Sequence, residues 1–200
     1  LGGGSNVLVS DKGIRGIVVL NRAKEVRFNL GDQPSVWSES GAVLSSVAHR
    51  AAAFGLGGLE WAANVPGTVG GAVYGNAGAF GSDVAHDLIQ ADILDGTSRT
   101  LWPVEKMDYG YRSSNLKKGG KKAVVLAAEF RLFNCKKEEA QSKIEQFSAK
   151  RKATQPPGAS MGSMFKNPEG DHAGRLIEAA GIKGTRIGNA EIRPVHGNFF

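Results

Sequence analysis

The chain has 200 residues, of which 41% are hydrophobic, and it carries a formal net charge of +6. This apolar content is enough for one large core or two small ones and argues against wholesale disorder. The single cysteine excludes an internal disulfide, the four histidines are too far apart for a metal site, and no apolar run reaches the roughly 20 residues of a membrane span. We expect a cytoplasmic protein without metal or membrane contact.

The first 134 residues alternate between strand-like and glycine-rich segments. Val43, Val47, Ala51 and Phe54 keep helical spacing, with Gly55 where a helix would stop. A long glycine-rich segment follows. Four segments rich in Val, Ile or Leu predict strands: residues 6–10, 14–20, 88–95 and 123–133.

The composition changes after Asn134. Residues 136–152 are charged and helical, with Ile144 and Phe147 on one face and a stop at residues 156–158 (PPG). A second helix is expected near residues 172–180, where Gly181 is the stop and the inward residues are Leu176, Ile177 and Ala180. A strand near residues 186–193 follows. We therefore place one domain at 1–134 and another at 135–200.

The positive charge has three interpretations: a solvated basic surface, an anionic small ligand or a nucleic acid. The basic residues are scattered, and no stripe of interleaved aromatic residues accompanies them. We therefore expect no nucleic-acid partner, although a basic binding module for nucleotides or nucleic acid stays open as an alternative.

Two glycine clusters carry the strongest chemical signal in the first domain. One is residues 2–6 (GGGSN), and the other is residues 65–71 (VPGTVGG), followed by residues 76–78 (NAG). Consecutive glycines allow several backbone N–H groups to point into one concavity that binds phosphate oxygens. Neither cluster is G-x-G-x-x-G or a P-loop. Each alone is also typical of a structural turn, but two of them in a basic domain favour a cofactor with a pyrophosphate.

Two further segments bring reactive side chains together. In residues 109–114 (YGYRSS), Arg112 lies beside aromatic residues, which suits either a surface stack or a carboxylate clamp. In residues 162–168 (GSMFKNP), a hydroxyl, a cation and an amide lie within a few positions, at Ser163, Lys166 and Asn167. That set can hold a polar substrate and deliver a proton, although a simple turn explains the same residues.

Six motifs follow one another along the chain: GGGSN, VPGTVGGAVYGNAGAFG, YGYRSS, GSMFKNP, AGRLIEAAGIKG and HGNF. Together they resemble the UDP-N-acetylenolpyruvoylglucosamine reductase family over essentially the whole chain. The glycine loops are shared with other flavoproteins, whereas YRSS combined with GSMFKNP is specific. The resemblance implies an α/β (α+β) fold, with an FAD-binding domain of the vanillyl-alcohol-oxidase/PCMH type followed by a smaller α+β substrate-binding domain.

The resemblance also implies a reaction and its residues. NADPH reduces FAD, and the hydride then passes to the enolpyruvyl ether of a UDP-sugar, a step of peptidoglycan precursor synthesis. Ser163 is the implied proton donor, and Arg112 stabilises the developing charge. The substrate contacts are Tyr111, Lys166 and Asn167. The positions that match the FAD loops are Gly3, Gly4, Ser5, Asn6, Pro66, Gly67, Thr68, Gly70, Gly71, Asn76, Ala77 and Gly78.

The chain opens inside a glycine turn without a Met and closes on an apolar stretch, so we expect it to be part of a longer protein. The family's N-terminal segment and its C-terminal catalytic glutamate are expected outside it. The small number of residues between Arg112 and Ser163 in the sequence indicates the shorter family subtype. We expect a monomer. A flavin oxidase or dehydrogenase with the same cofactor fold is the alternative enzyme, although it has no need for GSMFKNP.

Overall fold

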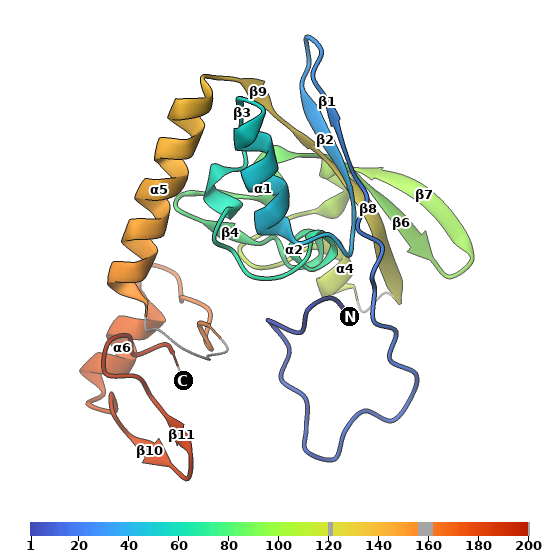
Figure 1. Cartoon of the computed structure of the whole chain (residues 1–200). Coiled ribbons are helices and arrows are strands. Elements are labelled where there is room, and N and C mark those ends of the chain that lie inside the picture. Colours follow the sequence, from blue (N-terminus) through green and yellow to red (C-terminus); the bar gives the residue numbers. More distant parts are fainter. Residues whose placement is uncertain (120–121, 156–161, 200) are drawn as a thin grey trace. The chain divides into compact units, whose positions relative to one another are not determined.

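The computed structural model describes residues 1–119, 122–155 and 162–199 (Figure 1). The chain divides into two compact units. Unit 1 comprises Leu1–Gly4 and Arg15–Phe147, and unit 2 comprises Ser5–Ile14 and Ser148–Phe200. The helix α5 (Lys137–Thr154) begins in unit 1, and its residues after Phe147 belong to unit 2. The predicted domain boundary lies just before this helix and stays a prediction.

Unit 1 is built on a five-stranded antiparallel sheet with strand order β1-β2-β8-β6-β7 (Figure 1). Its strands are β1 (Val26–Asn29), β2 (Ser35–Glu39), β6 (Leu88–Asp95), β7 (Ser98–Pro103) and β8 (Ala123–Arg131). The strands predicted at 88–95 and 123–133 are confirmed by β6 and β8. After β8, the short β9 (Phe133–Asn134) pairs with β3 (Leu56–Gly57).

Two helices complete the core of unit 1. The predicted helix near 43–54 is confirmed as α1 (Leu44–Ala53), and Gly55 follows it with a positive φ of 71°. The second helix, α2 (Val69–Gly75), lies against β8 and buries Val69, Ala72 and Val73. Buried side chains of both helices join those of the sheet in one cluster. Since α2 is anchored in this core, the glycine loop directly before it is held in place as well.

Several short elements complete unit 1. A small hairpin of β4 (Gly78–Ala79) and β5 (Ser82–Asp83) leads into the one-turn helix α3 (Val84–Asp87). The remaining short helices of unit 1 are η1 (Glu60–Ala62), η2 (Val104–Met107) and α4 (Asn115–Lys118).

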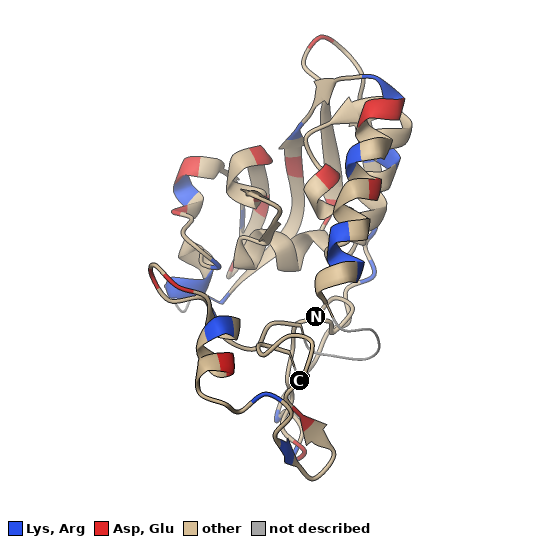
Figure 2. Cartoon of the chain, turned by 90° about the vertical axis from the view of Figure 1, so that its left-hand side faces the viewer, with Lys and Arg blue, Asp and Glu red and all other residues tan. Residues whose placement is uncertain are grey.

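The helix α5 carries charges of both signs along its length (Figure 2). It buries Ala140 and Ile144, and Phe147 packs against the core of unit 1. The ring of Phe147 stacks on Phe80 with the two centroids 4.4 Å apart. The predicted inward face with Ile144 and Phe147 is therefore confirmed. The predicted stop at residues 156–158 lies outside the described residues.

The strands predicted at residues 6–10 and 14–20 are wrong. Both segments are irregular, and their apolar side chains are exposed, with Leu8 at 75% and Ile17 at 96%. A turn links the two segments, in which the N–H of Gly13 donates to Ser10 O. A strand needs a partner that completes its hydrogen-bond ladder. No strand in the described part of the chain pairs with either segment.

Unit 2 contains the helix α6 (Ala173–Ala179) and a hairpin of β10 (Arg186–Ile187) and β11 (Ala190–Glu191). The predicted helix is confirmed, and Ile177 faces inward as predicted, half-buried against Gly197. Leu176 and Ala180 are exposed, because α6 packs through Ala173, Gly174 and Ile177. The single strand predicted near 186–193 is wrong. The chain reverses at Gly188, which has a positive φ of 60°. Among the residues that the structure describes, no helix has the length and apolar character needed to cross a bilayer.

Candidate functional site

The two predicted glycine clusters meet in unit 1. Gly2 lies so close to Thr68 that a Cβ atom on Gly2 would be 2.4 Å from Thr68 Oγ1 and 2.7 Å from Thr68 Cγ2. Both segments are thus brought together over the N-terminal end of α2. Gly4 has a positive φ of 77°, and a Cβ there would meet no atom within 4 Å. The first cluster therefore combines a close backbone approach at Gly2 with open space beside Gly4.

Part of the second cluster serves packing and backbone pairing. The N–H groups of Val69 and Gly70 donate to Ala42 O at 2.9 Å and to Ser40 O at 2.8 Å. A Cβ on Gly70 would lie 2.7 Å from the Cβ of Ser40. Glycine at position 70 therefore allows α2 to approach the chain that leaves β2, and its amide is already used. A Cβ on Gly71 would have its nearest neighbour at 3.8 Å, so that position is open.

The other predicted cofactor positions differ in their surroundings. Gly3 and Pro66 are exposed, and Gly67 is half-buried with a positive φ of 119°. Ser5 and Asn6 are exposed residues of unit 2. Only part of the predicted set is therefore assembled within unit 1, namely Gly3, Gly4 and the residues from Pro66 to Gly78.

Residues 76–78 form a tight turn after α2. Asn76 is buried, has a left-handed φ of 48°, and uses its side chain in contacts within unit 1. The N–H of Ala77 donates to Ala72 O, and Ala77 O accepts from the N–H of Val84. A Cβ on Gly78 would lie 2.7 Å from Ser82 O. The turn therefore leads directly into the hairpin of β4 and β5, and Gly78 lies close against β5.

Arg112 is half-buried and lies against this turn. Its Nη2 donates to Gly78 O at 2.5 Å and its Nη1 donates to Asn76 O at 3.2 Å. Its guanidinium carbon lies 5.5 Å from the ring centroid of Tyr111, which is exposed. Arg112 also has a positive φ of 53°, a conformation that a bulky side chain adopts only when its surroundings demand it. The predicted arginine is therefore fixed beside one of the predicted glycine loops.

Two residues of the same loop have roles that sequence reasoning missed. The buried Ser114 donates its hydroxyl to Tyr74 O at 2.6 Å, and Tyr109 donates its hydroxyl to Val73 O at 2.9 Å. Burial raises the pKa of the Tyr109 phenol, and the Asp83 carboxylate adds to this effect, so Tyr109 remains a donor. Both hydroxyls bind carbonyls of the last turn of α2. The only signal in the sequence is their place in the YGYRSS motif.

In unit 2, the segment with Ser163 is held by Asn198. The Nδ2 of Asn198 donates to Phe165 O at 2.8 Å, and its Oδ1 accepts from the N–H of Phe165 at 2.9 Å. Its carbonyl accepts from the N–H of Met164 at 3.0 Å. Asn198 is 3% exposed, whereas Ser163 is exposed. The HGNF motif thus presents GSMFKNP to solvent, a role that the motif alone does not reveal.

The predicted substrate contacts in unit 2 differ in availability. Lys166 is exposed. Asn167 is exposed too, but its Oδ1 accepts from the N–H of Ala173 at 3.1 Å and its Nδ2 lies 3.3 Å from the imidazole of His172. This arrangement caps the first turn of α6. The amide of Asn167 is therefore engaged within the unit, whereas Lys166 points its charge to solvent.

The buried carboxyl of Asp87, which is bound by Trp61 and His86, has an altered pKa. Asp87 is 5% exposed; its Oδ2 accepts from Trp61 Nε1 at 2.7 Å, and its Oδ1 lies 2.7 Å from the imidazole of His86. Burial raises the pKa of the Asp87 carboxyl, and the hydrogen bonds from Trp61 and His86 oppose this effect. Trp61 is itself buried in the core of unit 1.

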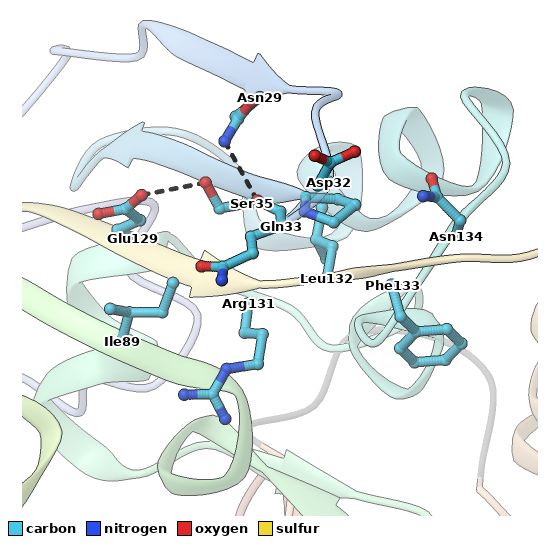
Figure 3. Close-up of a pocket in the computed structure, with 11 residues that line it drawn as sticks. Asn29, Asp32, Gln33, Ser35, Ile89, Glu129, Arg131, Leu132, Phe133 and Asn134 are labelled. Carbon is cyan, nitrogen blue, oxygen red and sulfur yellow. Dashed lines mark hydrogen bonds between the residues drawn. The ribbon is translucent and has the colours of Figure 1, made fainter.

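A cavity of about 650 Å³ lies at the start of β2 (Figure 3). It is lined by the turn between β1 and β2 and by the ends of β6 and β8. Inside it Ser35 donates to Glu129 at 3.0 Å. The cavity lies at Ser35, where β2 begins. Gly70 contacts Ser40, just after β2 ends, so the cavity is separate from the glycine loops. Among the described residues, no cluster of His, Cys, Asp or Glu is able to hold a metal ion.

Two family models match the chain. A model described as FAD binding domain matches residues 1–102. A model described as UDP-N-acetylenolpyruvoylglucosamine reductase, C-terminal domain, matches residues 153–200. The first match contains both glycine clusters, and the second contains the segment with Ser163 and Asn198.

Several known proteins that carry the name of this reductase resemble the chain over its whole length. The "UDP-N-acetylenolpyruvoylglucosamine reductase" of Chloroflexus aggregans is 46% identical over 204 residues, which cover 100% of this chain and 69% of that protein. The protein of the same name from Bacillus subtilis is 44% identical, with 100% and 66% covered. The crystal structure of the reductase from Thermus caldophilus superposes with a TM-score of 0.84 and 34% identity, and covers 100% of this chain and 72% of that one.

Proposed function

Because the chain belongs to the UDP-N-acetylenolpyruvoylglucosamine reductase family, we propose that Ser163 and Arg112 act directly on the enolpyruvyl group of its substrate. The protein is an FAD-dependent oxidoreductase that reduces UDP-N-acetylglucosamine enolpyruvate to UDP-N-acetylmuramate with NADPH, a step in peptidoglycan precursor synthesis. The observation that carries this function is the identity of 46% across the whole chain.

FAD, when bound, supplies the hydride transfer between NADPH and the enolpyruvyl group. The contact between Gly2 and Thr68 supports a cradle for its pyrophosphate, because the backbones of two glycine loops approach one another there. Gly4 and Gly71 offer open space beside their Cα atoms. We assign the direct contacts to Gly3, Gly4, Thr68 and Gly71. Gly70 and Asn76 support the loops through packing and internal hydrogen bonds.

Arg112 is suited to stabilise negative charge at the substrate carboxylate. Its two hydrogen bonds to Asn76 O and Gly78 O orient the guanidinium but use only part of its donor set. A planar guanidinium binds a carboxylate with two parallel hydrogen bonds. Preorganised charges of this kind are usually the largest catalytic contribution, because they need no reorganisation when the charge develops. The exposed ring of Tyr111 beside Arg112 is a further substrate contact in this proposal.

Ser163 is suited to deliver the proton that completes the reduction. Hydride addition to the terminal carbon of the enolpyruvyl group leaves the neighbouring carbon, next to the carboxylate, to be protonated. A serine hydroxyl is a weak acid, so this step depends on charge stabilisation by Arg112 and on the nearby cation of Lys166. Ser163 is exposed in a segment held by Asn198, which fixes the backbone and leaves the hydroxyl accessible.

We also propose that the protein acts in the cytoplasm as a monomer. The single cysteine supports a reducing compartment. Size-exclusion chromatography with light scattering tests the monomer directly. A stable dimer at micromolar concentration would contradict that part of the proposal.

The function is tested on the full-length protein with bound FAD. Purified enzyme with NADPH and the enolpyruvyl UDP-sugar is expected to form UDP-N-acetylmuramate, detected by mass spectrometry. Ser163→Ala should lower turnover by roughly 10²–10⁴-fold, the range for loss of a positioned proton donor. Ser98→Ala removes a hydroxyl from an exposed position of β7 and serves as the matched control. Equal turnover of the two variants would remove Ser163 from its role, and no product from the wild type would refute the function.

A further inference from the structure

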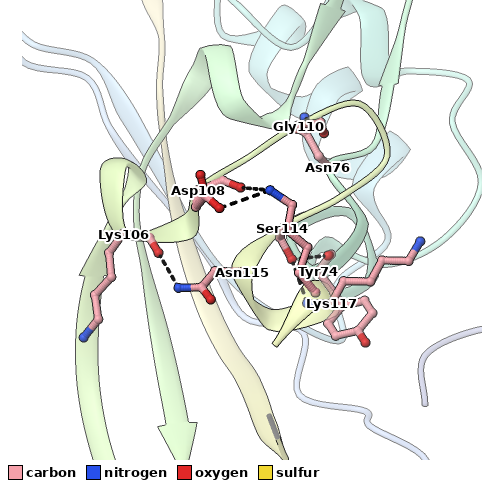
Figure 4. Close-up of polar contacts among 9 residues, drawn as sticks. Tyr74, Asn76, Lys106, Asp108, Gly110, Ser114, Asn115 and Lys117 are labelled. Atoms are coloured by element: carbon pink, nitrogen blue, oxygen red, sulfur yellow. Dashed lines mark hydrogen bonds and ion pairs between the residues drawn. The ribbon is translucent and has the colours of Figure 1, made fainter. Parts of the chain in front are cut away.

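One side chain joins three segments around Arg112. Asn76 follows α2 in a left-handed conformation and is 2% exposed. Its Nδ2 donates to Gly110 O and to Asp83 Oδ2, both at 3.1 Å, and its Oδ1 accepts from the N–H of Ala85 at 3.0 Å. The amide thus connects the end of α2, the start of α3 and the loop that carries Arg112. Figure 4 shows Asn76 beside Gly110 of this loop. All of these contacts lie within unit 1.

The loop of residues 108–114 is fastened to α2 at both of its ends. Its middle is a narrow turn, in which Gly110 and Ser113 exchange two backbone hydrogen bonds of 3.1 Å. Tyr109 donates to Val73 O on one side. Ser114 donates to Tyr74 O on the other (Figure 4). Between these two anchors, the amide of Asn76 holds the turn at Gly110 O, and Lys117 Nζ donates to Arg112 O at 3.2 Å.

Arg112 returns to the same residue. Its Nη1 donates to the carbonyl of Asn76, and its Nη2 donates to the carbonyl of Gly78, two residues further along. Asn76 therefore binds the backbone of the loop through its amide and the guanidinium of the loop through its carbonyl. Arg112 has a positive φ of 53°, which persists only where the surroundings over-determine it. This closed set of contacts provides that determination.

We propose that Asn76 is a positioning residue for Arg112: it holds the turn at Gly110 and so sets where the guanidinium meets the substrate carboxylate. The proposal rests on the role of Arg112 in the proposed function. It gives Asn76 a role in the substrate step rather than in direct contact with the cofactor. The buried, fully engaged amide is the reason.

Asn76→Gly is the suitable variant, because glycine adopts the left-handed conformation freely and only the amide is lost. In the FAD-loaded full-length enzyme, the two half-reactions are measured separately by anaerobic stopped-flow absorbance. We expect reoxidation by the enolpyruvyl sugar to slow about 10–100-fold more than reduction by NADPH, since a displacement near 1 Å costs about that much. In an Arg112→Ala background, Asn76→Gly should slow reoxidation by less than about 2-fold further.

A readout without turnover accompanies the kinetics. Amide hydrogen exchange of residues 109–113 should become faster in Asn76→Gly, because the turn loses the hydrogen bond from Asn76 to Gly110 O. Asn115→Ala is the matched control: it removes an amide that donates to Lys106 O at 3.2 Å, beside the same loop but without a link to Arg112 (Figure 4). It should leave both the exchange of residues 109–113 and the ratio of the half-reactions as in the wild type.

The outcomes separate this proposal from the function on which it rests. If Asn76→Gly slows both half-reactions equally, or if its effect on reoxidation adds fully to that of Arg112→Ala, Asn76 is a purely structural residue and the proposal is overturned. If Arg112→Ala itself leaves reoxidation unchanged, the role of Arg112 fails, and the positioning role fails with it. Selective slowing with no further loss in the Arg112→Ala background supports the proposal.

Discussion

Gly2 and Thr68 are in direct contact, with no room for a Cβ between them: that atom would lie 2.4 Å from Thr68 Oγ1. Thr68 is β-branched and stiff, so its side chain has little freedom to move aside. The contact brings one glycine loop against the other, which neither loop reveals alone. The proposed cofactor site of unit 1 depends on this approach.

Gly2→Ala should therefore weaken FAD binding. The added methyl overpacks the contact, at a cost of about 1–3 kcal/mol, which corresponds to roughly 5–150-fold in the dissociation constant. Titration of the apoprotein with FAD, followed by flavin fluorescence, measures this. Gly75→Ala, at a position of α2 where a Cβ would meet nothing within 4 Å, is the control and should bind FAD as the wild type does. Equal affinities for both variants would contradict the shared cradle.

Gly70→Ala should lower the free energy of unfolding by about 1–3 kcal/mol, because its methyl would lie 2.7 Å from the Cβ of Ser40. The second substitution Ser40→Gly removes that Cβ and should recover part of the loss. Urea unfolding of the two single variants and the double variant measures the coupling. Fully additive losses would show that this contact does not limit the packing of α2.

Asn198→Ala should loosen the segment that presents Ser163. The variant removes two hydrogen bonds between the Asn198 amide and the backbone of Phe165, each of which contributes about 0.5–1.5 kcal/mol. We expect a lower melting temperature and lower turnover. Asn198→Asp keeps the acceptor for the Phe165 N–H and should lose less. If both variants turn over like the wild type, Asn198 does not support the proton donor.

The buried Asp87 predicts a pH dependence of stability. Burial raises the pKa of its carboxyl above the ordinary value of 3.8, so the folded state holds the proton more tightly than the unfolded chain. Ionisation of Asp87 therefore lowers the free energy of unfolding. This loss develops as the pH rises from 3.8, the ordinary pKa, through the pKa of the folded state. Asp87→Asn, which can still accept from Trp61, should remove this fall.

The comparison is made by urea unfolding at a series of pH values from 3.5 to about 7. Asp95→Asn removes a charge at the exposed end of β6 and is the control. The difference in unfolding free energy between wild type and Asp87→Asn should grow with pH, whereas that for Asp95→Asn should not follow the same course. A constant difference for Asp87→Asn would refute the effect of burial.

Local patterns predicted those elements whose signals are local. α1 and α6 follow from helical spacing and from Gly55 and Gly181, and β8 follows from its run of Ala, Val and Leu. The run of Ile, Val and Leu at residues 14–20 wrongly predicted a strand. A strand also requires a neighbouring strand, and that neighbour is not visible in the segment itself. The prediction that Leu176 faces inward was wrong for a related reason. The contact face of α6 is set by Gly174 on the helix and by Gly197, which lies against the helix.

The candidate site was predicted as separate motifs. The glycine loops and Arg112 could be named from the sequence, but their meeting depends on contacts between residues far apart in the chain, such as Gly2 with Thr68 and Asn76 with Gly110. Asn76 illustrates the limit most clearly. Its place in a loop motif suggests a cofactor contact, and only its hydrogen bonds reveal that the amide is engaged elsewhere.

The most direct test of the account is an anaerobic two-step titration of the full-length, FAD-loaded Ser163→Ala enzyme, followed by flavin absorbance. NADPH should bleach the flavin bands of the variant at a rate close to that of the wild type. Adding the enolpyruvyl UDP-sugar should then restore the bands roughly 10²–10⁴-fold more slowly than in the wild type. Restoration at the wild-type rate would contradict the role of Ser163. Restoration by oxygen alone, in wild type and variant alike, would contradict the reductase and indicate an oxidase.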